Sequence, residues 1–375
     1  MSSPSPDITI PVDRLPGDGR FGSGPSKVRP DAVEALAKAS SGYLGTSHRQ
    51  AGVRFMVAAL RNGLAELLSL PDGYEIALGN GGTTAFWDAA TFQLIERRSQ
   101  HLSYGEFSSK FAACATAAPH LEDPEVITAQ PGSSPDAVAS PQVDAYCLTH
   151  NETSTGVATP PRRPEGAEGL VLVDATSAAG GLRFDPREVD AYYFAPQKGL
   201  ASEGGLWLAA LSPAAVERIE RIAAAGRWTP SFLDLAIALD NSRKDQTYNT
   251  PALATIFLAQ QQVEWILEQG GLPWAAARCE RSAEILYGWA ERQDFTTPFV
   301  SDPGRRSSVV ATIDLDASVP AATVSAVLRS NGIVDTESYR KLGRNQLRIA
   351  MFPAIEPADI EALTRCIDYV VEQLA

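Results

Sequence analysis

Short apolar runs recur along the first two-thirds of the chain and are separated by longer segments of mixed polarity. The runs are rich in aliphatic and aromatic residues, which is typical of buried strands. They cover residues 75–78, 101–104, 125–128, 145–149, 170–173, 192–194 and 205–211. Helices are predicted before, between and after these runs, at 31–39, 55–68, 85–95 and 213–225. This alternation predicts an α/β fold with a mostly parallel sheet sandwiched by helices.

The pattern changes near residue 250. A long helix is expected from Thr250-Pro251 to about residue 269, with the threonine as N-cap and the proline in the first turn. Further helices are expected at 274–289, 321–330 and 357–374, and strands at 309–313, 332–334 and 346–350. These elements predict a small α+β domain. We therefore expect an N-terminal arm (1–20), a large domain (21–255) and a small C-terminal domain (256–375) that begins with the long helix.

The composition is that of an ordinary globular protein, with 44% apolar and 21% charged residues in 375. The formal net charge of −13 argues against a general surface for nucleic acid or anionic membranes, since both need a basic face. No apolar run reaches membrane-spanning length. The cysteines and histidines show neither metal-ligand spacing nor a disulfide framework. We therefore expect a cytoplasmic protein without a bound metal.

Three polar groups stand where apolar runs end. Asp174 closes the run at 170–173, and Lys198 follows the run at 192–194. The turn Gly79-Asn80-Gly81-Gly82-Thr83-Thr84 joins another run to a predicted helix. Open α/β sheets bind their ligands at the carboxyl ends of the strands, and a glycine-rich turn at a helix N-terminus suits phosphate.

Pyridoxal phosphate requires these three kinds of group. Its phosphate binds a turn at a helix N-terminus, its pyridinium nitrogen pairs with a carboxylate, and its aldehyde forms a Schiff base with a lysine. The order of the 79–84 turn, Asp174 and Lys198 favours this cofactor over two alternatives. The first alternative is a turn with a purely structural role, and the second is a non-catalytic α/β protein that binds a small anion. A nucleotide-binding dehydrogenase is disfavoured, because no run is followed by Gly-x-Gly-x-x-Gly.

Eight polar segments resemble fold-type I pyridoxal phosphate enzymes of the class V aminotransferase group, and within it the phosphoserine aminotransferases of actinobacteria. They follow the family's order over nearly the whole chain. The segments are residues 21–27, 45–49, 79–87, 150–156, 173–177, 195–198, 248–251 and 339–348. The resemblance implies a seven-stranded type of sheet in the large domain and a separate small α+β domain.

The resemblance also implies how the cofactor ring is held. Lys198 would form the Schiff base, and Asp174 would pair with the ring nitrogen. Thr153 would hydrogen-bond the side of the ring that carries the 3′-hydroxyl. Phe107 falls where the family stacks an aromatic side chain on the ring.

The cofactor phosphate is expected to be shared between two subunits. By the resemblance, Thr83, Thr84 and Gln197 would bind it from one subunit. Asn249 and Thr250 would reach it from the neighbouring subunit. A homodimer would then be required for activity.

The implied reaction moves an amino group from glutamate to 3-phosphohydroxypyruvate, giving 2-oxoglutarate and O-phosphoserine for serine biosynthesis. Action on the four-carbon phosphorylated acid of pyridoxine biosynthesis stays open. Both substrates carry two anionic ends, so at least two cationic anchors are needed. By the resemblance, Arg348 binds the α-carboxylate, while His48 and Arg49 bind the distal phosphate or carboxylate.

One segment departs from the best-known bacterial members, which have a further His-Arg pair shortly before the carboxylate-binding arginine. This chain has Tyr339-Arg340-Lys341 there, with Arg344 close by. Because a cation is kept, Arg340, Lys341 and Arg344 are further candidates for binding substrate.

Other class V enzymes are the nearest alternatives. An alanine–glyoxylate or serine–pyruvate aminotransferase would share Lys198 and Asp174 but needs no second anionic anchor at His48-Arg49. A cysteine desulfurase is disfavoured, because no cysteine lies in a Gly/Ser loop suited to a mobile nucleophile.

Overall fold

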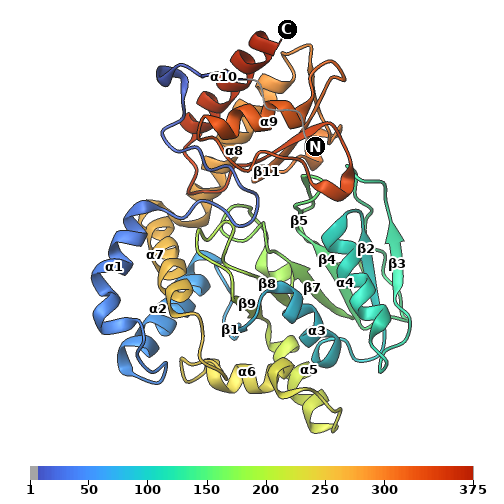
Figure 1. Ribbon diagram of the computed structural model, residues 1–375. Coiled ribbons are helices and arrows are strands. Elements are labelled where there is room, and N and C mark those ends of the chain that lie inside the picture. The colour runs from blue at the N-terminus through green and yellow to red at the C-terminus, as the bar shows by residue number, and fades with distance from the viewer. Residues whose placement is uncertain (1–6, 375) are drawn as a thin grey trace.

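The computed structural model describes residues 7–374, which form two bodies, each built around its own sheet (Figure 1). The larger sheet has seven strands in the order β1-β9-β8-β7-β4-β2-β3. These strands are β1 (Glu75–Asn80), β2 (Ser99–Ser103), β3 (Glu125–Thr128), β4 (Ala145–Thr149), β7 (Leu170–Asp174), β8 (Ala191–Phe194) and β9 (Leu206–Leu211). A short hairpin, β5 (Asn151–Glu152) with β6 (Val157–Ala158), follows β4.

The large sheet is mostly parallel, as the sequence predicted. β3, β2, β4, β7 and β8 pair in parallel, whereas β9 is antiparallel to both β8 and β1. Two antiparallel steps restore the direction, so β1 points the same way as β8. The carboxyl ends of β1, β2, β4, β7 and β8 therefore lie at one edge of the sheet.

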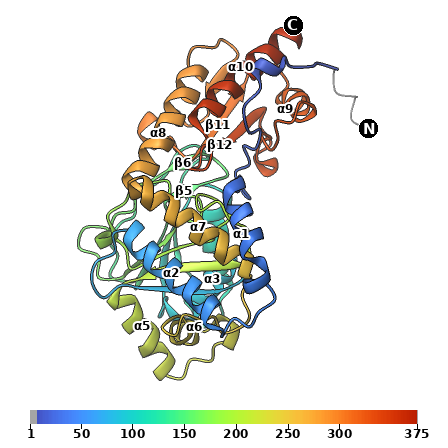
Figure 2. The same ribbon diagram turned by 90° about the vertical axis from the view of Figure 1, so that its left-hand side faces the viewer.

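Helices cover both faces of this sheet, and alternate side chains of each strand point to opposite faces. In β7, Leu170 and Leu172 join the apolar cluster that contains side chains of α3, α4, α5 and α6. Val171 and Val173 join the cluster that contains side chains of α2, α7 and α8. Figure 2 shows α1, α2 and α7 together over one face. These helices are α1 (Pro30–Tyr43), α2 (Ala51–Leu67), α3 (Thr83–Gln93), α4 (Glu106–Ala117), α5 (Pro213–Ala224), α6 (Leu235–Ser242) and α7 (Leu253–Gln269). Helix α8 (Gly271–Ala290) follows α7 and packs mainly against α10 (Pro357–Leu374) in the smaller body.

The smaller body contains an antiparallel sheet in the order β10-β11-β12. Its strands are β10 (Thr296–Pro298), β11 (Val310–Leu315) and β12 (Gln346–Ala350). Helices α9 (Ala321–Ser330) and α10 (Pro357–Leu374) also belong to this body. Short 3₁₀ helices lie at Val12–Arg14, Pro186–Glu188, Ser231–Leu233, Pro303–Arg305 and Arg340–Leu342.

The N-terminal segment lies along this smaller body. The backbone N–H of Ile10, a buried residue, donates to Asn331 Oδ1 at 2.9 Å. The N–H of Gly17 donates to Asp359 Oδ1 at 2.8 Å. Residues 1–6 of the predicted arm lie outside the described residues, and the division into an arm and two domains stays a prediction.

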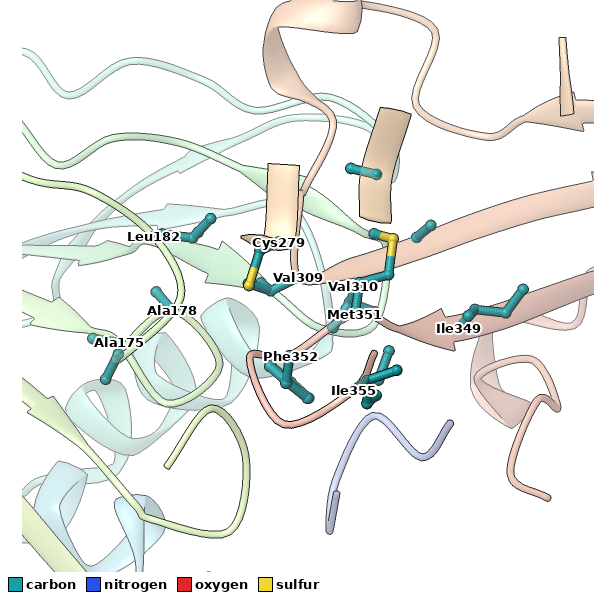
Figure 3. Packing of buried hydrophobic residues seen from close by; sticks show 14 of the residues in the cluster. Ala175, Ala178, Leu182, Cys279, Val309, Val310, Ile349, Met351, Phe352 and Ile355 are labelled. Carbon is teal, nitrogen blue, oxygen red and sulfur yellow. The ribbon is translucent and has the colours of Figure 1, made fainter. Parts of the chain in front are cut away.

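The two bodies share one apolar cluster. Figure 3 shows Ala175 and Ala178, from the loop after β7, beside residues of the smaller body such as Val309 and Phe352. A Cβ at Gly181 would lie 2.6 Å from Val309 Cγ1, so the backbone at Gly181 lies directly against the Val309 side chain. Because close-packed interiors resist deformation, this contact holds the start of β11 against the loop that follows β7.

Some local predictions were wrong. The predicted N-cap at Thr250 is replaced by Ala252, because the carbonyl of Thr250 accepts a hydrogen bond from Asn80 Nδ2 at 2.9 Å and holds the segment outside the helix. The strand predicted at 332–334 is a single bridge between Val334 and Arg20. Helices α4 and α6 and strand β10 were not predicted. Within residues 7–374, no helix is long and apolar enough to cross a membrane.

Candidate active site

Loops at the shared carboxyl edge of the large sheet surround a cavity of about 380 Å³. Strand register places Thr149 opposite Asp174 and Asp174 opposite Tyr193, so the tips of β4, β7 and β8 are neighbours. The cavity is lined by Gly24, Pro25, Gly82, Thr83, Thr84, Trp87, Phe107, Thr149, Asn151, Thr153, Asp174, Thr176, Gln197, Lys198 and Gly204. The structure thus brings together the predicted lysine, carboxylate, ring-side residues and one-subunit phosphate residues.

Lys198 is buried in this cavity, with 7% of its surface exposed. Its Nζ donates to Thr153 Oγ1 at 3.4 Å and lies 5.5 Å from the centre of the Phe107 ring. The pKa of Lys198 is lowered from 10.5 to about 8, first by burial and second by the charge of Arg348. The neutral amine is therefore accessible near pH 8, well below the usual range for a lysine.

The segment before α1 closes over the lysine. A Cβ at Gly24 would lie 2.8 Å from Lys198 Nζ, and the φ of Gly24 is +147°. A side chain here would meet both a steric and a conformational obstacle. Glycine at this position therefore allows the backbone to lie against the reactive amine.

Asp174 is a buried carboxylate, 5% exposed, at the end of β7. It accepts hydrogen bonds from Trp87 Nε1 at 3.1 Å and from the N–H of Thr176 at 2.9 Å. Burial raises the pKa of Asp174, and the hydrogen bonds from Thr176 and Trp87 act in the opposite direction. Within residues 7–374, no lysine, arginine or histidine forms an ion pair with it, so it can accept a cationic partner.

The N-terminus of α3 faces the same cavity. Gly81 has a φ of +113°, which turns the chain from β1 into the helix, and Gly82 is the N-cap. Thr83 and Thr84 occupy the first two helical positions, where backbone N–H groups have no partner within the helix. The hydroxyl of Thr83 lies 2.7 Å from that of Thr176. Gln197 Oε1 is buried without a hydrogen-bond partner among residues 7–374.

Arg348 borders the site from the smaller body. Its Nη1 donates to the carbonyl of Thr153 at 3.5 Å, and its guanidinium lies 5.3 Å from the centre of the Tyr339 ring. Burial lowers the pKa of Arg348. Its Nε is buried and, among the described residues, has no partner. The guanidinium therefore has donors available for an anion.

His48, Arg49, Asn249 and Thr250 do not line this cavity. His48 is buried, and its Nδ1 lies 3.3 Å from Thr250 Oγ1. Burial, followed by the charge of Arg49, lowers the pKa of His48. The four residues form a second group near the end of β1, where Asn80 holds the Thr250 carbonyl.

The three further cations differ in their surroundings. Arg344 pairs with Asp314, with Nε donating to Oδ1 at 3.0 Å, and its guanidinium lies 4.5 Å from the Phe299 ring centre. Lys341 forms an ion pair with Glu106, at the start of α4. Arg340 is exposed and, within residues 7–374, forms no ion pair. Arg344 is thus occupied in a structural contact, whereas Arg340 is available.

Comparison with known proteins identifies the family. The profile of the family described as aminotransferase class-V matches residues 20–337. The chain belongs to the class-V aminotransferase family. A phosphoserine aminotransferase from Nocardioides sp. is 60% identical over 370 residues, which cover 98% of this chain and 99% of that protein.

A second relative agrees with this assignment, and one solved structure has the same fold. A phosphoserine aminotransferase from Rhodococcus jostii is 58% identical over 366 residues, which cover 97% of this chain and 98% of that protein. The crystal structure of a phosphoserine aminotransferase from Cytophaga hutchinsonii has a TM-score of 0.87 at 23% identity, covering 94% of this chain and 99% of that one. The sequence-based resemblance to this family is confirmed, and so is the fold class.

The cofactor of this class-V aminotransferase is pyridoxal phosphate, and the cavity residues fit it. A buried carboxylate without a cationic partner matches a protonated ring nitrogen, because an unpaired buried charge is costly. The free N–H groups of the α3 N-terminus match a phosphate. Lys198 provides the amine for the aldehyde.

Several residues at the site were missed by the sequence analysis. Trp87 and Thr176 hold Asp174, and Ser177 accepts hydrogen bonds from both Asn151 and Thr153 at 2.8 Å. Trp87 lies one helical turn after Thr83, so its spacing could have placed it on the same face of α3. The contacts of Ser177 join separate loops, and no local pattern indicates them.

Proposed function

We propose that this protein transfers the amino group of glutamate to 3-phosphohydroxypyruvate, giving O-phosphoserine and 2-oxoglutarate. The observation that carries the proposal is the cavity in which a buried lysine, a buried carboxylate and a phosphate-type helix N-terminus converge. Full-length identity of about 60% to relatives named phosphoserine aminotransferase supports the choice of substrates. The alternative class V function, that of a serine–pyruvate or alanine–glyoxylate aminotransferase, is equally consistent with the residues proposed to bind the cofactor.

When bound, pyridoxal phosphate supplies an electron-withdrawing ring that stabilises the electron pair released when the substrate Cα loses its proton. Lys198 would accept that proton and later return it, and its lowered pKa suits this role near neutral pH. The Thr153 hydroxyl, held by Ser177 and contacted by Lys198, would orient the amine.

The remaining cofactor residues would orient the ring and phosphate. Asp174 would pair with the ring nitrogen, with its two oxygens held by Trp87 and Thr176. Thr83, Thr84 and Gln197 would bind the phosphate. Phe107 would cover one face of the ring, since its own ring lies 5.5 Å from the lysine Nζ.

Arg348 would bind the substrate α-carboxylate with a fork of donors. The free Nε of Arg348 and its position beside Thr153 support this role. Arg340 and Lys341 would approach the distal anion from the smaller body. Arg340 is the best suited of the three, because Lys341 is already paired with Glu106 and Arg344 with Asp314.

We further propose a homodimer in which Asn249 and Thr250 complete the partner's phosphate site. His48 and Arg49 would accompany them, because His48 contacts Thr250. Tyr248, beside this pair, is 47% exposed in the single chain and would be covered by the partner. We expect the dimer in the cytoplasm, in keeping with four free cysteines.

A hybrid dimer tests the shared site. A subunit carrying Lys198→Ala and one carrying Asn249→Ala with Thr250→Ala should each form an inactive homodimer. Co-expressed with two different tags and purified through both, they should form a hybrid with one intact site and about half of the wild-type activity. An inactive hybrid would argue against the shared site.

A coupled assay that follows 2-oxoglutarate tests the reaction. With glutamate as donor, 3-phosphohydroxypyruvate should give a kcat/KM far above those of pyruvate and glyoxylate. Equal or greater turnover of either unphosphorylated acid would refute the proposed specificity. A colourless protein that does not gain visible absorbance with added pyridoxal phosphate would refute the whole assignment.

A further inference from the structure

Glu152 is a fully buried carboxylate that the proposed chemistry does not use. Its exposure is 0%, and it forms no ion pair with the basic residues described between 7 and 374. Four hydrogen bonds satisfy it instead. It accepts from the N–H of Phe107 at 3.2 Å, the N–H of Ser108 at 2.9 Å, the N–H of Ser154 at 3.2 Å and the hydroxyl of Ser154 at 2.6 Å.

These bonds join two loops that are far apart in the sequence. Phe107 and Ser108 form the first turn of α4, whose N–H groups have no partner within the helix. The hydroxyl of Ser154 adds a third contact, because it accepts from the N–H of Glu106 at 3.0 Å. Glu152 and Ser154 together therefore cap α4 from the loop that also carries Thr153.

The backbone at Gly105 lies directly against the Glu152 side chain. A Cβ at Gly105 would lie 2.3 Å from Glu152 Cγ and 2.4 Å from its Cδ. The φ of Gly105 is −172°, an extended conformation that any residue can adopt. Glycine is therefore needed here because the Glu152 side chain occupies the space beside it.

We propose that Glu152 is a positioning residue that holds the Phe107 ring and the Thr153 hydroxyl in place beside the Lys198 amine. The inference rests on the proposed function, since it assigns the two held groups to the cofactor. Phe107 lines the cavity from α4 and Thr153 lines it from the β4 loop. Glu152 accepts from backbone N–H groups of both segments, and the hydroxyl of its neighbour Ser154 links the Glu152 carboxylate to the N–H of Glu106.

The carboxylate also acts on the lysine through its charge. Together with Asp174, Glu152 opposes the burial and the Arg348 charge that lower the pKa of Lys198. Removing the charge of Glu152 should therefore lower the pKa of this amine further. A residue with only a structural role at α4 would not change that titration.

The test compares Glu152→Gln with Asp144→Asn as a matched control. Asp144 also accepts from three successive backbone N–H groups, those of Glu96, Arg97 and Arg98, at 2.8–2.9 Å. It lies just before β4, at the opposite end of the strand from Glu152. Unlike Glu152, Asp144 also pairs with Arg218 at 3.1 Å. Both substitutions exchange one acceptor oxygen for an NH₂ group, so both should lower thermal stability.

Only Glu152→Gln should alter the cofactor site. Titration of the cofactor-free proteins with pyridoxal phosphate should give a Kd raised about 2- to 12-fold, equivalent to the ~0.5–1.5 kcal/mol of an aromatic stacking contact. The pH titration of the visible absorption band should move to lower pH. Asp144→Asn should leave the Kd and the band titration at their wild-type values.

A double-mutant cycle tests the route of the effect. If Glu152 acts through the ring, Glu152→Gln should change the Kd less in a Phe107→Leu background than in the wild type. Should Glu152→Gln fail to fold, Gly105→Ala reaches the same carboxylate by steric displacement and should raise the Kd in the same way.

The outcomes separate this proposal from the proposed function. Equal Kd changes in Glu152→Gln and Asp144→Asn, with no movement of the band titration, would overturn the role of Glu152 alone. A wild-type Kd for Gly105→Ala would overturn it as well. Failure of the wild-type protein itself to bind pyridoxal phosphate would instead overturn the proposed function.

Discussion

Replacing Lys198 by methionine should abolish turnover and, at neutral pH, stabilise the cofactor-free protein. The ammonium is buried in the wild type with no carboxylate within ion-pairing distance among residues 7–374. Folding therefore brings a charge into a poorly solvated site. Methionine has a similar length, fills the same space and carries no charge, so this cost is removed.

The magnitude follows from the lowered pKa. A change in pKa from 10.5 to about 8 corresponds to ~3 kcal/mol of stability. The unfolded chain holds the proton up to pH 10.5, whereas the folded chain releases it near pH 8. The cost is therefore complete below pH 8, decreases between pH 8 and 10.5, and is absent above that range.

Urea denaturation of the cofactor-free proteins at pH 7 and pH 9.5 measures this effect. The variant should be more stable than the wild type by up to ~3 kcal/mol at pH 7, and the difference should shrink at pH 9.5. Lys38→Met, at an exposed position of α1, is the control and should change stability by less than ~0.5 kcal/mol. A stability difference for Lys198→Met that is zero, or the same at both pH values, would refute the reasoning.

Three further predictions concern the site. Trp87→Phe removes the indole donor to Asp174. The loss of this charged hydrogen bond, worth ~1.5 kcal/mol, should lower kcat about 10-fold. Unchanged steady-state kinetics would contradict the role of that bond. Arg340→Ala should raise the KM for 3-phosphohydroxypyruvate, whereas Arg344→Ala should leave the KM unchanged and lower the free energy of unfolding by up to ~1 kcal/mol. Arg348→Lys should raise the KM for glutamate about 10-fold or more, because a point charge replaces a bidentate fork, and an unaltered KM would remove Arg348 from the carboxylate site.

The linear sequence contained most of the information that defines the fold and the cofactor cavity. Buried parallel strands appear in the sequence as continuous apolar runs, so a polar residue at the end of such a run is easy to identify. Asp174 and Lys198 were found in this way, and the Gly79–Thr84 turn was found from its glycines. The shared edge followed because parallel strands end on the same side.

Weak local signals explain the elements that were missed. α4 presents Phe111 and several alanines to the core, so its apolar stripe is narrow and its N-cap is a glycine. Its true cap is Glu152, 44–45 residues later in the chain. The Thr250-Pro251 pair has a good local helix-start pattern, but the contact with Asn80 at the end of β1 prevailed.

The sequence by itself determined which chemical groups this protein has and the order in which the strands present them, because strand ends and glycine turns are local features. Only the tertiary structure decided which cations are free and which are engaged: Arg344 is held by Asp314, Lys341 by Glu106, and Arg348 faces the lysine. The physical reason is that ion pairs, burial and pKa shifts depend on through-space distance, which sequence separation does not specify.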